Sequence, residues 1–168
     1  LDANTTGSNN TALGRASLTS STTASGNTAV GYAAGESITT GAENVIVGAS
    51  AGDALTIGEK NVAIGEGALT ADDVGSRNVA VGWDALGSQN ATGGSVNNFY
   101  NVAVGANTGF SVTTGYYNTF VGGLAGDDTD DGIQNTAVGY AALSANCDNG
   151  NTAIGNEALK VCTGFHNT

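Results

Sequence analysis

The sequence predicts an all-β protein that folds as a parallel β-solenoid of about nine rungs, each of roughly 16–17 residues. Three observations lead to this prediction. A five-residue motif recurs at nearly constant spacing, apolar side chains alternate with period two inside it, and a glycine closes it. A repeat this short is typical of one coil of a solenoid rather than of a helical repeat or a propeller blade.

The motif reads Asn-(Thr/Val)-x-(Val/Ile/Leu)-Gly, where x is Ala in seven of nine copies and Ile46 or Phe120 in the other two. The copies begin at Asn10, Asn27, Asn44, Asn61, Asn78, Asn101, Asn118, Asn135 and Asn151, and a tenth opens at Asn167. Their spacing is nearly constant, except that the step into Asn101 is longer and the last two steps are slightly shorter. We therefore expect a single solenoid domain at residues 10–168, preceded by a polar lead-in at residues 1–9.

The centre of each motif has the pattern of a short strand. The residues one and three positions after the Asn are branched or apolar, as in Val45 and Val47, so they share one face of the strand. We expect this pair to fill the core. Because the residue between them is also small and apolar, the strand is expected to be covered on both faces.

Glycine marks the corners of the predicted rung. The Gly that closes each motif fits a turn that needs positive φ or close backbone approach, and another Gly precedes most of the Asn positions by three residues. Between these corners lies a second apolar step, as in Ala68-Leu69. Each rung is therefore predicted to contain about two strands and two or three corners. The recurring Asn is expected to stack as an amide ladder at one corner.

Charge and hydropathy exclude two classes of function. The chain has 4 basic and 15 acidic residues, and its net charge of -11 would repel a phosphate backbone. No apolar run approaches the roughly 18 residues of a membrane-spanning helix. No charged-then-apolar leader opens the segment, so any export signal is expected to lie outside it. We expect neither nucleic-acid binding nor a membrane span.

Two stretches of the repeat carry a family resemblance. Residues 135–143 read Asn-Thr-Ala-Val-Gly-Tyr-Ala-Ala-Leu, and residues 61–69 read Asn-Val-Ala-Ile-Gly-Glu-Gly-Ala-Leu. This unit resembles the head repeats of trimeric autotransporter adhesins, and it is equally similar to repeats of phage tail-fibre proteins of the same β-roll type. The likeness covers residues 10–168. The rungs here are longer than typical adhesin-head rungs, and no heptad stalk, neck or anchor is visible in the segment.

The resemblance implies a left-handed parallel β-roll and the side-by-side association of three chains, with the small residue of each motif helping to close the trimer. It also implies a non-catalytic structural or adhesive fibre segment that presents loops to a surface receptor or glycan. Such a segment would be extracellular, on a cell surface or on a virion. From the residues alone, end-to-end stacking into a filament is an alternative to the trimer, since an unpaired strand edge invites pairing.

The longer step before Asn101 adds six residues, which predicts a loop at residues 87–100 that could carry binding. Aromatic residues end this loop and recur one rung later. We expect these four rings to gather into a patch on one edge, as a candidate glycan-binding site or as rings that stabilise a corner. They are Phe99, Tyr100, Tyr116 and Tyr117.

An acidic stretch before Gly132 is a second candidate site. Its four carboxylates belong to Asp127, Asp128, Asp130 and Asp131. Several oxygen ligands of this kind suit Ca²⁺, although the stretch lacks the ordered spacing of a calcium loop. An acidic, solvated turn is the alternative interpretation. No other metal or cofactor is indicated.

The two cysteines lie on neighbouring rungs. Cys147 and Cys162 fall within one position of the vertical register set by the local repeat. We expect a disulfide and hence an oxidising compartment, with two buried free thiols as the alternative.

The residue types for catalysis are scarce. His166 is the single histidine, so a Ser-His-Asp triad or a histidine metal cluster has little to draw on, and we expect no enzyme. A left-handed β-helix acyltransferase is an alternative, but that family needs three hexapeptide steps per rung and a catalytic histidine. An ice- or mineral-binding solenoid is a further alternative, although no Thr-x-Thr face repeats here.

Overall fold

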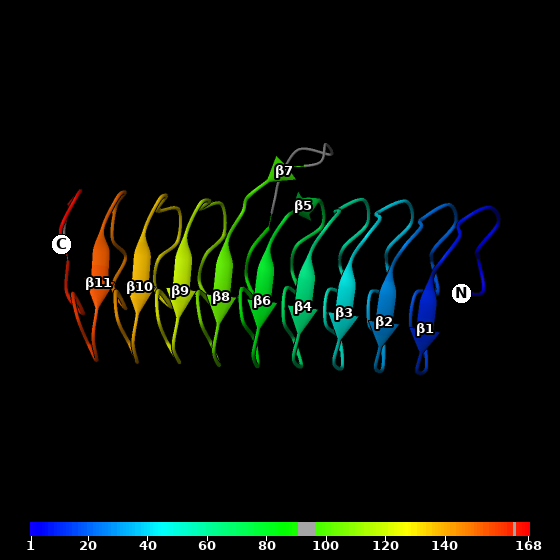
Figure 1. Ribbon diagram of the computed structural model, residues 1–168, viewed down its shortest axis with the longest axis horizontal. Helices are drawn as coiled ribbons and strands as arrows, with labels where there is room; N and C mark the ends of the chain where they lie inside the picture. Colours follow the sequence, from blue (N-terminus) through cyan, green and yellow to red (C-terminus); the bar gives the residue numbers. More distant parts are fainter. Residues whose placement is uncertain (91–96, 163) are drawn as a thin grey trace.

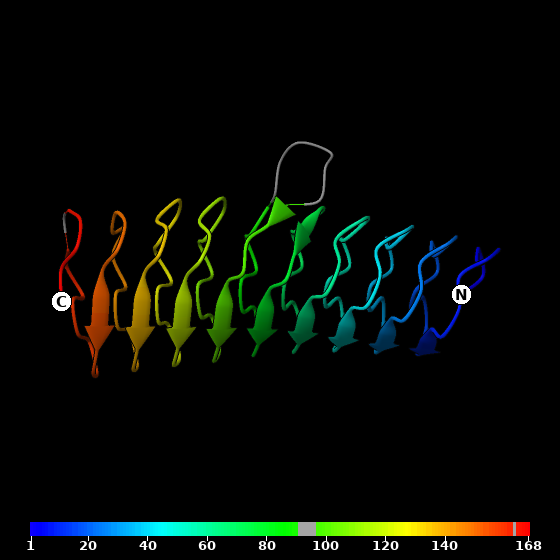
Figure 2. The same ribbon diagram turned by 45° about the horizontal axis from the view of Figure 1, so that its top comes forward.

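The chain is an all-β solenoid. A computed structural model describes residues 1–90, 97–162 and 164–168, and within these ranges there is no helix. Short strands lie side by side in one row along a rod, and the loops of each rung rise on one side of that row (Figures 1 and 2). The predicted fold class is therefore confirmed.

Among the described residues, nine strands form one parallel sheet and two more form a small second sheet. The strands of the main sheet are β1 (Thr11–Leu13), β2 (Thr28–Val30), β3 (Val45–Val47), β4 (Val62–Ile64), β6 (Val79–Val81), β8 (Val102–Val104), β9 (Thr119–Val121), β10 (Thr136–Val138) and β11 (Thr152–Ile154). The second sheet consists of β5 (Gly75–Ser76) and β7 (Asn97–Asn98). Each strand of the main sheet falls directly after a motif Asn, as the sequence predicts.

Every motif stacks on the next in strict register. Val62 of β4 pairs with Val79 of β6, and Val79 pairs with Val102 of β8 although the longest rung separates them. The extra length of that rung is therefore accommodated outside the main sheet. Residues 1–9 also follow the coil, since Thr5 donates to the carbonyl of Thr22 and Gly26 donates to that of Ser8.

The face of the strand that lies in the core is the opposite of the one expected from the sequence. The middle residue of the motif is fully buried, as for Ala63, Ala80 and Phe120, whereas the branched residues on either side of it point outward. Val104 of β8 remains 37% exposed. The prediction that positions one and three fill the core was wrong. The small residue between them, which was expected to help close a trimer, lies instead in the core of its own rung.

The reason for this difference is the narrowness of the rung. Ala at the middle position faces a second wall of small residues, including Ala68 and Ala85, and most rungs add one large apolar side chain such as Leu69 or Leu86. Two columns of Val and Ile would overfill this space, and overpacked cores are strained. The inward column therefore contains mostly alanine.

Where the middle residue is large, glycine lies beside it. Phe120 packs against Gly126 of its own rung and Gly109 of the preceding rung: a Cβ built on Gly126 would lie 2.6 Å from the Phe120 ring, and one on Gly109 would lie 3.1 Å from it. Ile46 likewise takes the room beside Gly35, where an added Cβ would approach it to 3.1 Å. Glycines in the facing column thus leave the room that Phe120 and Ile46 occupy in the core.

The second apolar step is a turn rather than a strand. Ala68 and Leu69 are buried, but Leu69 has a φ of 56°, in the left-handed region, and Leu86 and Leu143 also have positive φ. The prediction of about two strands per rung was therefore wrong for most rungs, because a left-handed residue ends an extended segment.

The glycine that closes the motif is required by close approach between rungs. Gly48 has a φ of 139°, and a Cβ at this position would lie 2.4 Å from the carbonyl oxygen of Gly65, its counterpart on the next rung. A side chain would push the rungs apart, so only glycine allows the backbones to stack at this corner.

The motif Asn forms a buried ladder, which confirms the prediction of an amide stack. The backbone N–H of Asn61 donates to the Oδ1 of Asn44 at 2.9 Å, and the N–H of Asn78 donates to the Oδ1 of Asn61 at 2.9 Å. The Nδ2 of Asn61 donates to the carbonyl of Gly75 at 2.9 Å. The Asn61 amide therefore joins two rungs through both ends of its side chain.

We predict that Asn61→Ala lowers the free energy of unfolding by about 2–5 kcal/mol, because it leaves the Asn78 N–H and the Gly75 carbonyl buried without their partner. Chemical denaturation measures the change. Asn156→Ala, at an exposed asparagine outside the ladder, is the matched control and should have little effect. Equal effects of the two substitutions would contradict the role of the ladder.

We also predict that the large core side chain of this rung can be moved from position 120 to position 126. Phe120→Ala alone should lower the free energy of unfolding by about 3–5 kcal/mol by opening a cavity, and Gly126→Leu alone should destabilise by its clash with the Phe120 ring. The double variant reproduces the Ala63/Leu69 arrangement and should be more stable than either single variant. Denaturation of all four proteins gives the coupling energy, and simple additivity would show that the columns pack independently.

Candidate ligand-binding surface

The longer rung contributes β7 to the second sheet. β5 and β7 pair in parallel, with Gly75 opposite Asn97 and Ser76 opposite Asn98. Of the loop expected at residues 87–100, residues 91–96 lie outside the described part of the chain. The next motif begins at Asn101, directly before β8, and β8 pairs in register with β6.

A buried network of polar side chains stabilises the coil at the longer rung. No sequence pattern indicated this network. The Nε2 of Gln89 donates to Oδ2 of Asp72 at 2.6 Å, and the Nδ2 of Asn101 donates to Oε1 of Gln89 at 2.8 Å. Asp72 also accepts from the backbone N–H of Gly75 at 2.9 Å. All three polar side chains are fully buried. The network joins the ladder to both sides of the longer rung.

The four aromatic residues come together, but in two layers. Phe99 is buried and packs with Val74 in a small core of its own. Tyr100, Tyr116 and Tyr117 lie at the surface: the ring centroids of Tyr100 and Tyr117 are 5.7 Å apart, and the ring of Tyr116 meets that of Tyr117 edge-on at 5.0 Å. The expected aromatic patch therefore consists of three exposed rings above a buried one.

Arg77 closes one side of the aromatic group. Its guanidinium lies 5.7 Å from the centre of the Tyr100 ring and donates to the Oδ1 of Asn98. These contacts join the corner of the preceding rung to β7 and to the first tyrosine. Because it contacts both Tyr100 and Asn98, Arg77 restricts the positions of two side chains at the edge of the patch.

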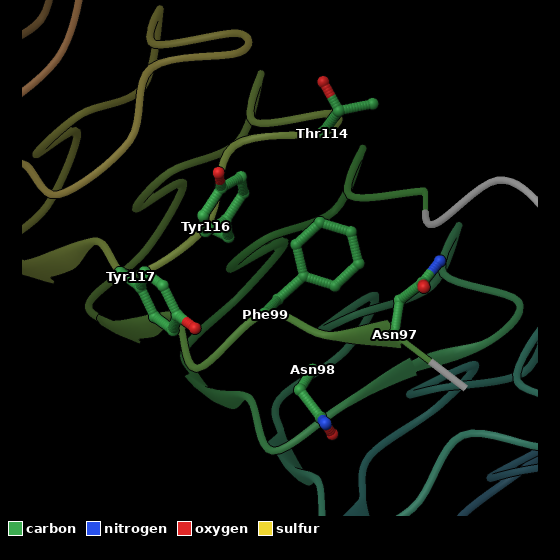
Figure 3. A pocket seen from close by; sticks show the side chains of 6 residues that line it. All are labelled: Asn97, Asn98, Phe99, Thr114, Tyr116 and Tyr117. Atoms are coloured by element: carbon green, nitrogen blue, oxygen red, sulfur yellow. The ribbon is translucent and has the colours of Figure 1, made fainter. Parts of the chain in front are cut away.

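A hollow of about 320 Å³ lies between the rings and β7. Phe99 lines it between Tyr116 and Tyr117 on one side and Asn97 and Asn98 on the other, and Thr114 lies at the top of the view (Figure 3). Tyr100 does not line it. The sequence pattern missed Asn97, Asn98 and Thr114. Only the pairing of β7 with β5 brings Asn97 and Asn98 opposite the tyrosines. Thr114 lies two residues before Tyr116 and has no aromatic ring to mark it.

The four aspartates lie on one turn without forming an enclosed site. Asp128, Asp130 and Asp131 are exposed, and Asp127 is half-buried. Asp130 accepts a hydrogen bond from the hydroxyl of Thr113 on the preceding rung. Within the described ranges there is no group of three or more His, Cys, Asp or Glu side chains placed to hold a metal ion.

Burial raises the pKa of the Asp127 carboxyl above its usual value, and the charge of Asp128 raises it further. The raised pKa means that the protonated acid is the form favoured by folding. Stability from this group is present at low pH and is lost as the pH rises through the folded-state pKa.

Cys147 and Cys162 are joined in a disulfide, with their Cα atoms 5.7 Å apart. The bond connects the last two rungs and lies in the continuous hydrophobic core. His166 lies against Gly150 at the same end of the coil, where a Cβ added to the glycine would meet the imidazole at 2.9 Å.

The outward side of the main sheet is a separate surface, which we call the outer face. It consists of the first and third residues of the nine strands and contains no charged residue. The third position of each strand forms an apolar column along the rod: Leu13, Val30, Val47, Ile64, Val81, Val104, Val121, Val138 and Ile154.

No protein-family model, no curated protein and no solved structure matches this chain. In the described ranges, no helix is long and apolar enough to cross a membrane.

We predict that Asp127→Asn raises the free energy of unfolding at pH 7, because the amide resembles the protonated acid that folding favours. The gain should shrink as the pH falls below about 4, where the wild-type carboxyl is also protonated. Thermal melts at both pH values, with the exposed Asp131→Asn as control, measure the effect. If Asp127 instead ligated a cation, Asp127→Asn would be destabilising at pH 7 in the presence of calcium.

Proposed function

We propose that this chain is a non-catalytic segment of an extracellular fibre, of the adhesin-head or phage tail-fibre kind. Its solenoids would associate side by side as a trimer and present their outer edges to a receptor or glycan. The single observation that carries the proposal is the outer face, whose third-position column is apolar along the whole rod and which no other part of the described chain covers.

The dimensions of the outer face support association along the whole rod. Nine strands at about 4.8 Å spacing give a strip roughly 40 Å long. Soluble monomers rarely expose a continuous apolar strip of several hundred Å², whereas interfaces between subunits commonly contain one. Val104 in the middle of the strip is 37% exposed and Ile154 at its end is 72% exposed. A second copy of the chain supplies a surface of the same length and period.

Three aromatic residues extend this strip along the neighbouring corner. Tyr32, Trp83 and Tyr140 each follow a motif glycine, and each is more than half exposed. They lie three rungs apart, which corresponds to a spacing of about 14 Å. Ala106 and Gly123 occupy the two positions of that column between Trp83 and Tyr140. Exposed aromatic rings next to small residues are the anchors and recesses found at protein interfaces.

The disulfide supports an extracellular location. Bonds of this kind persist in oxidising compartments and are rare in the cytosol. The coil itself supports a spacer role, because repeated rungs extend a rod by nearest-neighbour stacking without converging on one point.

We predict that the wild-type protein has three times the chain mass of 16.4 kDa in solution. Val104→Lys should dissociate it, because a lysine in the middle of the outer face would be buried without a partner in the assembly. Light scattering coupled to size exclusion measures both masses.

Thr40→Lys, which adds the same charge at an exposed corner, is the control and should leave the mass unchanged. Circular dichroism verifies that each variant is folded. A wild-type monomer, or a trimer that persists in Val104→Lys, would overturn the proposal.

A further inference from the structure

We infer that the hollow beside β7 binds a single pyranose ring, the terminal sugar of a glycan. The inference rests on the proposed function in one respect, because it specifies the class of ligand that the proposed fibre would bind. Its residues are Asn97, Asn98, Phe99, Thr114, Tyr116 and Tyr117.

The size and chemistry of the hollow select this ligand. A volume of about 320 Å³ is at the small end of the range for ligand pockets, which suits one ring rather than a peptide. A pyranose has an apolar C–H face and a rim of hydroxyls. Aromatic rings offer the complementary apolar surface, while the Nδ2 of Asn98, whose Oδ1 accepts from Arg77, can donate a hydrogen bond and the hydroxyl of Thr114 can both donate and accept.

An organic cation is the competing ligand for a group of aromatic rings. Arg77 argues against it, because this guanidinium already lies over the Tyr100 ring and contacts Asn98 at the edge of the hollow. A second positive charge would be repelled there. A neutral or acidic sugar meets no such repulsion.

The rings are not needed for the corner they occupy. The same corner positions hold Ala42-Glu43 and Glu59-Lys60 on earlier rungs and Ile133-Gln134 on a later one. The residue before each of these Asn positions has positive φ whether it is aromatic or not, as for Glu43 at 59° and Tyr117 at 60°. The fold therefore tolerates many residue types here, and four of the five aromatic residues at these corner positions, all except Phe165, lie on the two rungs beside the hollow.

The site is held in shape before a ligand arrives. Tyr117 is packed between Tyr100 and Tyr116, and Phe99 is fixed in the small core with Val74. Rigid side chains lose little conformational entropy on binding, which favours recognition by a small ligand.

Saturation-transfer NMR on the disulfide-bonded protein tests the inference. The probes are the methyl pyranosides of glucose, galactose, mannose and N-acetylglucosamine, together with N-acetylneuraminic acid and choline chloride. We expect transfer to the ring C–H protons of at least one sugar and none to choline. Tyr116→Ala should weaken sugar binding at least tenfold, Tyr116→Phe should retain most of it, and Thr114→Val should weaken it.

The matched control is Phe165→Ala, because Phe165 occupies the corner position of Tyr116 three rungs later, outside the hollow. It should leave sugar binding unchanged. Binding of no sugar, equal binding by Tyr116→Ala, or binding of choline would overturn the inference.

Light scattering of the same samples separates this result from the proposed function. A trimer that binds none of the sugars overturns the sugar site alone. A monomer that binds a sugar through Tyr116 upholds the site and overturns the proposed assembly.

Discussion

The fold depends on one interaction, the hydrogen bond that the side-chain carbonyl of each motif Asn accepts from the backbone N–H of the next. Asn27, Asn44 and Asn61 are fully buried and repeat this contact with the same length of 2.9 Å. A strand of three residues makes few backbone hydrogen bonds of its own, and a lone rung cannot offset its loss of conformational entropy. The amide fixes the register of each strand at the residue directly before it.

The ladder also explains how the chain tolerates an irregular rung. The N–H of Asn101 still donates to the Oδ1 of Asn78 at 3.1 Å across the longest step. Gln89 adds a side-chain amide that bonds to Asn101, and Asp72 bonds to Gln89 in turn. A coil that keeps its register by such contacts can accommodate a longer rung, and the aromatic group and the hollow lie beside β7 of that rung.

The repeat predicted the fold class, the position of every strand in the main sheet and the ladder, because Asn and Gly recur at positions where few other residues fit. It did not predict which face of the strand lies inside. Val and Ile are usually core residues, and alternation alone does not give the volume of the rung. The informative signal was the pairing of large residues with glycines, as Phe120 with Gly126.

The candidate site was also predictable only in part. Tyr116 and Tyr117 could be placed beside Tyr100 from the period of the repeat. Asn97 and Asn98 could not, because their position depends on where the longer rung rejoins the coil rather than on any local pattern.

Hydrogen exchange of the backbone amides tests the central role of the ladder most directly. We expect the N–H groups of Asn44, Asn61 and Asn118 to be among the slowest to exchange, at a rate set by global unfolding. In Asn44→Ala, the N–H of Asn61 should lose more protection than the strand amides beside it. Exchange of these Asn amides as fast as that of exposed corner amides would contradict the account.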